Sequence, residues 1–65
     1  MIVEIEGHTI RVRDIKSVHL DTRHYINGRE DTCCIELYDG KIFRVTENPL
    51  GMHYNIVLAM KREQP

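Results

Sequence analysis

Long hydrophobic runs are missing from this chain. No stretch approaches the roughly 20 consecutive apolar residues that a membrane-spanning helix needs. The segment Met1–Ile5 also lacks the basic and then apolar layout of a secretory signal. Together these absences predict a cytoplasmic protein that has no membrane partner.

An excess of charge of one sign is missing as well. The nine basic and ten acidic residues give a net charge of −1, and the two signs are interspersed along the chain. This balance argues against a protein built mainly to coat nucleic acid, because that function relies on a large positive charge. A local basic patch stays open, and the excess of arginine over lysine suits planar, bidentate contacts.

Cysteine is too scarce for a disulfide scaffold or a paired zinc motif. The two cysteines, Cys33 and Cys34, are adjacent. Neighbouring residues of a strand point to opposite faces, which makes a disulfide between them geometrically poor. We therefore expect one cysteine in the core and the other as an exposed thiol. Phosphate-binding glycine loops and serine-hydrolase elbows are also absent, so no cofactor, metal site or catalytic residue is predicted.

The chain length sets the scale of what this protein can do. Its 65 residues suffice for one small domain, predicted over residues 1–65. A domain of this size buries only about 60% of its unfolded surface, which leaves little room for the deep, dry cleft of a typical enzyme. We therefore predict a non-enzymatic protein-binding adaptor or regulatory module, whose small margin of stability self-association would increase.

The strongest turn signal is Asn27-Gly28, a dipeptide typical of tight β-hairpins. A two-residue turn there pairs residues whose numbers sum to 55. Leu20 then faces Ile35 and Val18 faces Leu37, so that apolar side chains meet on one face of the hairpin. The sequence thus predicts a long antiparallel hairpin around this turn.

Two shorter hairpins follow from the same argument about faces. A two-residue turn at Glu6-Gly7 gathers the apolar residues of both flanking strands on one face. A three-residue loop over residues 38–40, with glycine in the left-handed position, does the same and pairs Ile35 with Phe43. The connection after the first hairpin is predicted to be a single turn that places Ile15 in the core.

The C-terminal part of the chain changes to a helical periodicity. Asn48 can cap a helix that has Pro49 in its first position, and we predict that this helix covers the apolar face of the sheet. The predicted fold is therefore α+β, a five-stranded antiparallel β-meander with one C-terminal helix packed on the sheet. The apolar face of the helix is predicted to contain Leu50, His53, Tyr54, Ile56, Val57 and Met60.

The end of the long hairpin extends beyond the expected footprint of the helix. Arginine and tyrosine dominate binding hot spots, and sets of aromatic residues and arginines also stack on nucleobases. A solvated hairpin end whose charges pair across the strands accounts for the same residues. Among these alternatives we predict a partner-binding site, with a protein favoured over nucleic acid. Its residues are Arg23, His24, Tyr25, Ile26 and Arg29.

A free sheet edge is the other place where a partner can add. An edge strand presents unpaired backbone groups, and these groups can accept a strand of another protein or of a second copy. The sequence therefore also leaves a homodimer open.

One polar cluster resembles cysteine–histidine chemistry. Cys34 and His19 fall on the same predicted sheet face, beside Asp21 and Glu36. Nearby carboxylates raise the pKa of a thiol, whereas a nucleophilic cysteine needs a lowered one. The histidines as a set are predicted on different faces of the fold, so neither catalysis nor metal binding is expected.

The order of short motifs resembles that of one family. The motifs are Met1-Ile2, Gly7 before Ile10 and Val12, Ile15 and Val18, and Ile35-Glu36-Leu37 running into Asp39-Gly40-Lys41, Val45 and Glu47. In this pattern the chain is similar to the small FlbD/SwrD-type proteins linked to bacterial flagellar operons. The resemblance implies a role connected with bacterial flagella and carries over no functional residue. A phage or mobile-element accessory protein fits the same compact design.

Overall fold

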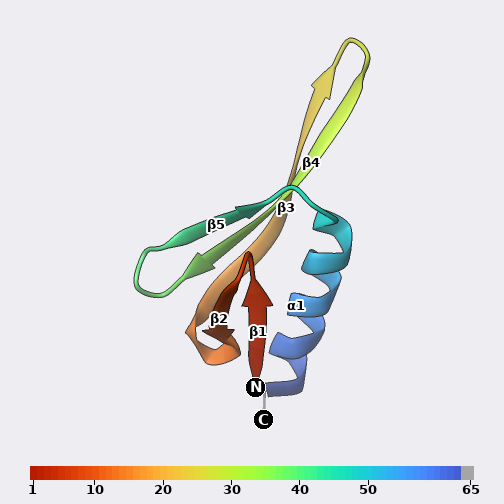
Figure 1. Ribbon diagram of the computed structural model, residues 1–65. Coiled ribbons are helices and arrows are strands. Elements are labelled where there is room, and N and C mark those ends of the chain that lie inside the picture. Colours follow the sequence, from red (N-terminus) through yellow and green to blue (C-terminus); the bar gives the residue numbers. More distant parts are fainter. Residues whose placement is uncertain (64–65) are drawn as a thin grey trace.

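The computed structural model describes residues 1–63, which form five strands, a 3₁₀ turn and one α-helix (Figure 1). The predicted α+β class, with five antiparallel strands and a C-terminal helix, is confirmed. The strands form two sheets, β1-β2 and β3-β4-β5, in place of one continuous meander. The elements are β1 (Ile2–Ile5), β2 (His8–Arg11), η1 (Val12–Asp14), β3 (Ile15–Tyr25), β4 (Gly28–Leu37), β5 (Ile42–Val45) and α1 (Pro49–Glu63).

The 3₁₀ turn η1 separates the two sheets. The Val12 N–H donates to the Met1 carbonyl (3.0 Å), which holds the start of η1 against β1, and the Tyr38 N–H donates to the Asp14 carbonyl (3.0 Å). The turn thus directs the chain from β2 into β3 without pairing these two strands. Ile15 is buried, as predicted. The predicted turn over residues 13–17 is wrong in its bounds, because the turn is Val12–Asp14 and Ile15 is the first residue of β3.

Both short hairpins have the predicted registers. Ile5 pairs with His8 across a turn in which Glu6 and Gly7 both have positive φ (49° and 81°). The loop over residues 38–40 is closed by the Leu37 N–H, which donates to the Lys41 carbonyl (2.9 Å). Cα pairing joins Ile35 to Phe43 across it, as predicted.

The long hairpin forms, but the predicted turn position is wrong by one residue. The turn is Ile26-Asn27, Tyr25 pairs with Gly28, and paired residue numbers sum to 53 instead of 55. Val18 therefore faces Ile35, and Leu20 faces Cys33. A shift of two in the sum leaves every side chain on its face, so apolar matching alone could not distinguish the two registers.

A register shift between Ile15 and Ser17 changes the faces near the start of β3. Ser17 pairs with Glu36, whereas Ile15 pairs with Leu37. The extra residue at this β-bulge reverses the alternation. Ile15 therefore joins Val18 on the inner face of the sheet.

The core lies on this inner face, which α1 contacts along β3 and β4. Figure 1 shows α1 running alongside the sheet and the end of the β3–β4 hairpin projecting away from it. Ile35 of β4 and Ile56 of α1 are fully buried in one apolar cluster. The cluster consists of Ile5, Ile15, Cys33, Ile35, Leu37, Val45 and Ile56.

The predicted helix is present, but part of its predicted apolar face is wrong. Leu50 and Tyr54 are 54% and 63% exposed, whereas Ala59, which the prediction omitted, is buried. Apolar residues occur nearly all round this helix, so periodicity alone defines the buried face poorly. Met52, which the prediction also omitted, packs against the core.

No helix within residues 1–63 has the length and apolarity that are needed to span a membrane.

The start of the helix differs in one detail from the prediction. Asn48 precedes Pro49, and its carbonyl accepts from the Met52 N–H (3.1 Å), as the residue before a helix should. Its φ is 48°, in the left-handed region, where a capping residue is normally extended. The Asn48 side chain lies over Gly51, close enough to collide with any Cβ at that position.

Candidate functional site

Residues 21–31 form a two-stranded projection, which we call the arm. Residues 21–30 are all exposed, and the arm stands clear of α1 and β5 (Figure 1). It gives the molecule its elongated dimensions of 43 × 21 × 18 Å. Tyr25 is 52% exposed and Ile26, in the turn, is fully exposed.

Polar pairs hold the arm together. The Thr22 hydroxyl donates to Asp31 Oδ1 across the strands at 2.8 Å, and Arg29 Nε lies 3.6 Å from Asp31 Oδ2. Arg23 pairs with Glu30 in the strand register. Each arginine of the arm thus has a carboxylate on its own hairpin, which reduces the positive potential that the arm presents.

The five predicted partner-binding residues are all on the arm, but they do not form one patch. Arg23 and Tyr25 are two residues apart on β3 and share its outer face. His24 and its cross-strand partner Arg29 lie on the opposite face. Ile26 occupies the turn between the strands. A partner that contacts one side of the arm therefore meets Arg23, Tyr25 and Ile26 together.

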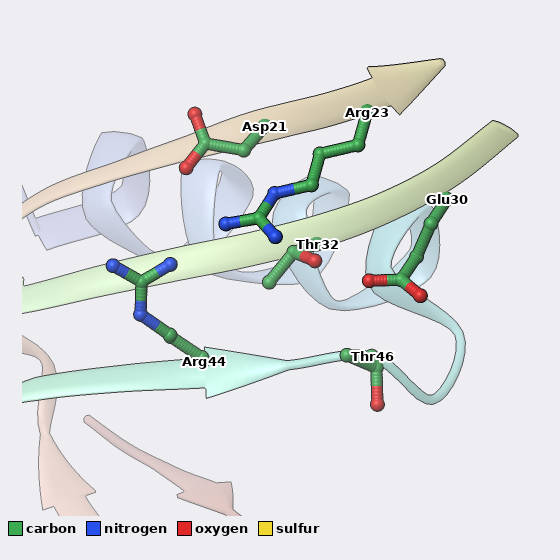
Figure 2. A pocket seen from close by; sticks show the side chains of 6 residues that line it. All are labelled: Asp21, Arg23, Glu30, Thr32, Arg44 and Thr46. Atoms are coloured by element: carbon green, nitrogen blue, oxygen red, sulfur yellow. The ribbon is translucent and has the colours of Figure 1, made fainter. Parts of the chain in front are cut away.

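A pocket lies at the base of the arm, on the same outer face. Figure 2 shows the guanidinium groups of Arg23 and Arg44 pointing toward one another across β4, with Thr32 beside them. The cavity measures about 220 Å³. It opens where β5 ends at Val45 while β4 continues into the arm. Its lining residues are Asp21, Arg23, Glu30, Thr32, Arg44 and Thr46.

The pocket residues suggest the kind of group that fits there. Among residues 1–63, neither Arg23 nor Arg44 has a carboxylate oxygen within 4.0 Å, so both guanidinium groups keep free donors. Two guanidinium groups with neighbouring hydroxyls suit a planar carboxylate. Asp21 and Glu30 also line the pocket, and their charges disfavour a more highly charged anion such as phosphate.

Sequence reasoning placed Arg23 in the site and missed the rest of the pocket. Arg44, Thr32 and Thr46 come from β4 and from the residues at the end of β5. The predicted pairing of Ile35 with Phe43 across residues 38–40 is correct, and the same register places Arg44 opposite Cys34 on the outer face. The predicted register of the long hairpin was wrong, and this register determines where Arg23 lies relative to β5.

Beside the pocket, Cys34 is the centre of a polar cluster. Its Sγ donates to Asp21 Oδ2 at 3.2 Å and accepts from Arg44 Nη1 at 4.0 Å. His19 Nε2 lies 4.0 Å from Asp21 Oδ1. Cys34 is only 3% exposed, so the prediction of an exposed thiol is wrong, because larger neighbours cover this small side chain on the outer face.

The environment of Cys34 keeps its thiol protonated. Burial raises the pKa of Cys34, the hydrogen bond and charge of Asp21 raise it further, and Arg44 opposes them. Burial also raises the pKa of Cys33, which is in the core as predicted. Since the thiolate is the nucleophile, this geometry does not favour cysteine catalysis near neutral pH.

The histidines are dispersed, as the predicted faces required. His8 packs its ring against Phe43 with the centroids 5.5 Å apart, His24 is on the arm, and His53 is on α1. Only His19 belongs to a cluster of metal-ligating side chains within residues 1–63.

The fold and the pocket together describe a small α+β domain with a projecting hairpin arm. Comparison with protein-family models, curated protein sequences and solved structures returned no match. The similarity to FlbD/SwrD-type proteins therefore stays a prediction from the sequence pattern.

Proposed function

We propose that this protein is a small non-enzymatic adaptor or regulatory module that binds a protein partner through the arm and the pocket at its base. The observation that carries the proposal is the exposure of Tyr25 and Ile26 at the end of an arm that projects away from α1 and β5. Burying an isoleucine side chain is worth about 1.5–3 kcal/mol. At this position the side chain gains that energy only from a partner.

The charges of the arm favour a protein over nucleic acid. Residues 21–31 contain two arginines against three carboxylates, and Arg29 is already near Asp31. A phosphate backbone would meet these carboxylates as well as the arginines, and nucleic-acid affinity depends on net phosphate neutralisation. Nucleic-acid binding through Arg23, Tyr25 and Arg29 is therefore the second candidate.

The pocket indicates the chemistry of the partner surface. A partner that lies along the arm can fill both features at once if it has an apolar recess for Ile26 at the tip and an aspartate or glutamate that reaches the base. Its carboxylate would lie between the guanidinium groups of Arg23 and Arg44, where bidentate contacts are available. Aromatic and arginine side chains of this kind are the ones that dominate interface energies.

The proposal is tested by affinity capture with two matched variants. One carries Arg23→Ala, Tyr25→Ala and Arg29→Ala and keeps the turn residues. The control carries Tyr38→Ala and Lys41→Ala. These substitutions remove an exposed tyrosine and a cation from the connection between β4 and β5. Each bait is incubated with host extract, with and without nuclease, and a photo-cross-linking residue at position 26 marks direct contacts.

We expect a nuclease-resistant protein that cross-links from position 26, is lost with the arm variant and is retained by the control. Loss of every captured species on nuclease treatment would favour the nucleic-acid candidate. Equal capture by both variants would reject the arm as the binding surface.

Self-association is the other interaction that the fold supports. β3 is an edge strand of 11 residues that pairs on one side with β4, and such an edge can pair with a second copy. A mass by light scattering that rises from monomer to dimer with concentration would support a homodimer. A constant monomer mass up to high concentration would reject it.

A further inference from the structure

We propose that His19, Asp21 and Cys34 form a binding site for a divalent transition-metal ion of the zinc class. One potential ligand atom from each of these residues lies within 4.8 Å of the other two. The site is on the outer face of the sheet and shares Asp21 with the lining of the pocket. Cobalt binding is measured on the chain alone and partner capture on host extract, so either proposal can fail without the other.

Two paired strands position the three ligands. His19 and Asp21 are two residues apart on β3 and share a face, and Cys34 of β4 is the cross-strand partner of His19. The sulfur–carboxylate distance is 3.2 Å, and the imidazole–carboxylate distance is 4.0 Å. Ligand atoms on one tetrahedral zinc ion lie roughly 3.2–3.8 Å apart, given bonds of about 2.0–2.3 Å. The His19 side chain is 57% exposed, so it can rotate and bring its imidazole nitrogen within this distance of the other two ligand atoms.

The donor set selects the class of metal. A thiolate, an imidazole and a carboxylate together suit zinc and its neighbours, whereas magnesium and calcium prefer oxygen ligands alone. The Cys34 S–H now donates to Asp21. Its proton leaves to solvent as the bond from Sγ to the metal forms. The thiolate and the carboxylate then balance the two positive charges of the ion.

The surroundings of the cluster fit such a site. The imidazole and carboxylate face solvent, so water can complete a tetrahedral coordination. The guanidinium of Arg44, whose Nη1 is 4.0 Å from Sγ, can donate to the coordinated thiolate as an outer-shell partner. Arg44 also carries a like charge to the metal, which opposes binding, so the change in affinity on its removal shows which of the two effects is larger.

The chain supplies its own control for the cysteine ligand. Cys33 is adjacent to Cys34 in sequence but faces the apolar core and is fully buried. His24 provides the corresponding control for His19, because it lies on the exposed arm away from the cluster.

The experiment is a titration of the purified full chain with Co²⁺, followed by absorption spectroscopy under reducing conditions. Cobalt reports a cysteine ligand through a thiolate-to-metal charge-transfer band, and reports tetrahedral geometry through intense visible bands. We expect both bands to saturate at one equivalent and to disappear when Zn²⁺ is added. Cys34→Ser should abolish the charge-transfer band. His19→Ala should weaken cobalt binding about tenfold or more, since loss of a direct ligand should cost at least as much as loss of an outer-shell partner.

The controls decide whether this cluster is the site. Cys33→Ser and His24→Ala should keep the wild-type spectrum. If Cys33→Ser does not fold, His19→Ala against His24→Ala still tests the site, because both side chains are exposed. The proposal is overturned if the wild type gives no thiolate band, if the band survives in Cys34→Ser, or if His19→Ala and His24→Ala bind cobalt equally.

Discussion

The two halves of the β3–β4 hairpin share one strand ladder and differ in what surrounds it. The lower half, which we call the body half, includes Val18 to Leu20 and Cys33 to Leu37, with β5 along one edge and α1 against the inner face. β5 pairs only with residues 33–36, and beyond its base the arm projects away from both β5 and α1. Strand pairing is continuous through both halves, so the difference between them comes from the third strand and the helix.

The sequence of each half matches its surroundings. Pairs on the inner face of the body half are apolar, such as Val18 with Ile35. Pairs in the arm are polar, such as Thr22 with Asp31 and Arg23 with Glu30. A two-stranded hairpin is only marginally stable by itself. The arm therefore depends on the body half for its order, while the body half has no comparable need of the arm.

The largest difference between the halves is expected from two isoleucine variants. Ile35→Ala, in the core, should lower the free energy of unfolding by about 2–5 kcal/mol through lost burial and the cavity left behind. Ile26→Ala, at the tip, should change it by less than about 0.5 kcal/mol. Urea unfolding followed by circular dichroism measures both. If Ile35→Ala is unfolded, Ile35→Val should still show a loss of about 0.5–1.5 kcal/mol.

Equal effects of the two alanine variants would contradict this comparison, because the exposed tip would then contribute to folding as much as the core.

A smaller difference is expected between two glycines in the turns. Gly40 closes the loop beside the body half with φ of 95°, and Gly28 follows the arm turn with φ of 149°. A Cβ at either position meets no atom within 4 Å, so alanine tests backbone conformation alone. Gly40→Ala should cost about 1–2 kcal/mol. Gly28→Ala should cost the body less, because the arm can open locally.

Amide hydrogen exchange distinguishes the two responses. Gly28→Ala should accelerate exchange in the arm while residues 33–37 stay protected. Accelerated exchange of both regions in this variant would mean that arm and body open as one unit.

The features that could be predicted from sequence are those with a local signal. Face alternation and turn chemistry gave the fold class, the Glu6-Gly7 turn and the loop over residues 38–40, because in each case the wrong register would have moved apolar side chains to the solvent face. The turn at Ile26-Asn27 could not be found this way, since it differs from the predicted one by a shift that changes no face. The division into two sheets depends on tertiary packing around η1, for which the sequence has no comparable signal.

The candidate sites show the same division. Exposure of the arm followed from its position beyond the expected footprint of the helix. The grouping of Cys34 with His19 and Asp21 followed from face alternation, although the predicted partner of Cys34 was Asp21 rather than His19. The pocket needs the relative position of Arg23 and Arg44, which depends on the correct register and on where β5 ends. Burial of Cys34 depends on how its neighbours fold over it.

A smaller and more local effect is expected where the body half meets the arm, in the rate at which Cys34 is alkylated. Asp21→Asn should lower the raised pKa of Cys34 and speed its alkylation several-fold at mildly alkaline pH, whereas Arg44→Gln should slow it. Tandem mass spectrometry distinguishes Cys34 from Cys33, which should react only on global opening. Because the folded protein favours the protonated thiol, the stability that this thiol contributes is present below its ordinary pKa and is lost as pH rises through the raised one.

An unchanged rate in Asp21→Asn would show that opening of the structure, and not the charge of Asp21, limits alkylation.

The smallest effect on stability is expected from removal of most of the arm. Residues 23–30 can be replaced by Asn-Gly, which joins the paired residues Thr22 and Asp31 by a two-residue turn. We expect a free energy of unfolding within about 1 kcal/mol of the full chain, since the arm buries little apolar surface and the shorter connection costs less entropy to close. Urea unfolding and exchange protection of residues 33–37 provide the measurement.

The truncated protein also separates folding from binding. If its body remains folded and partner capture disappears, the arm is a binding element carried by an independent support. If the body unfolds, the comparison between the two halves is wrong, and some part of residues 23–30 must contribute to folding despite its exposure. Loss of capture by the truncated chain would then be uninformative, whereas the Arg23, Tyr25 and Arg29 variant, which keeps the arm backbone, would still report on binding. The two variants together therefore distinguish an arm that binds from an arm that folds.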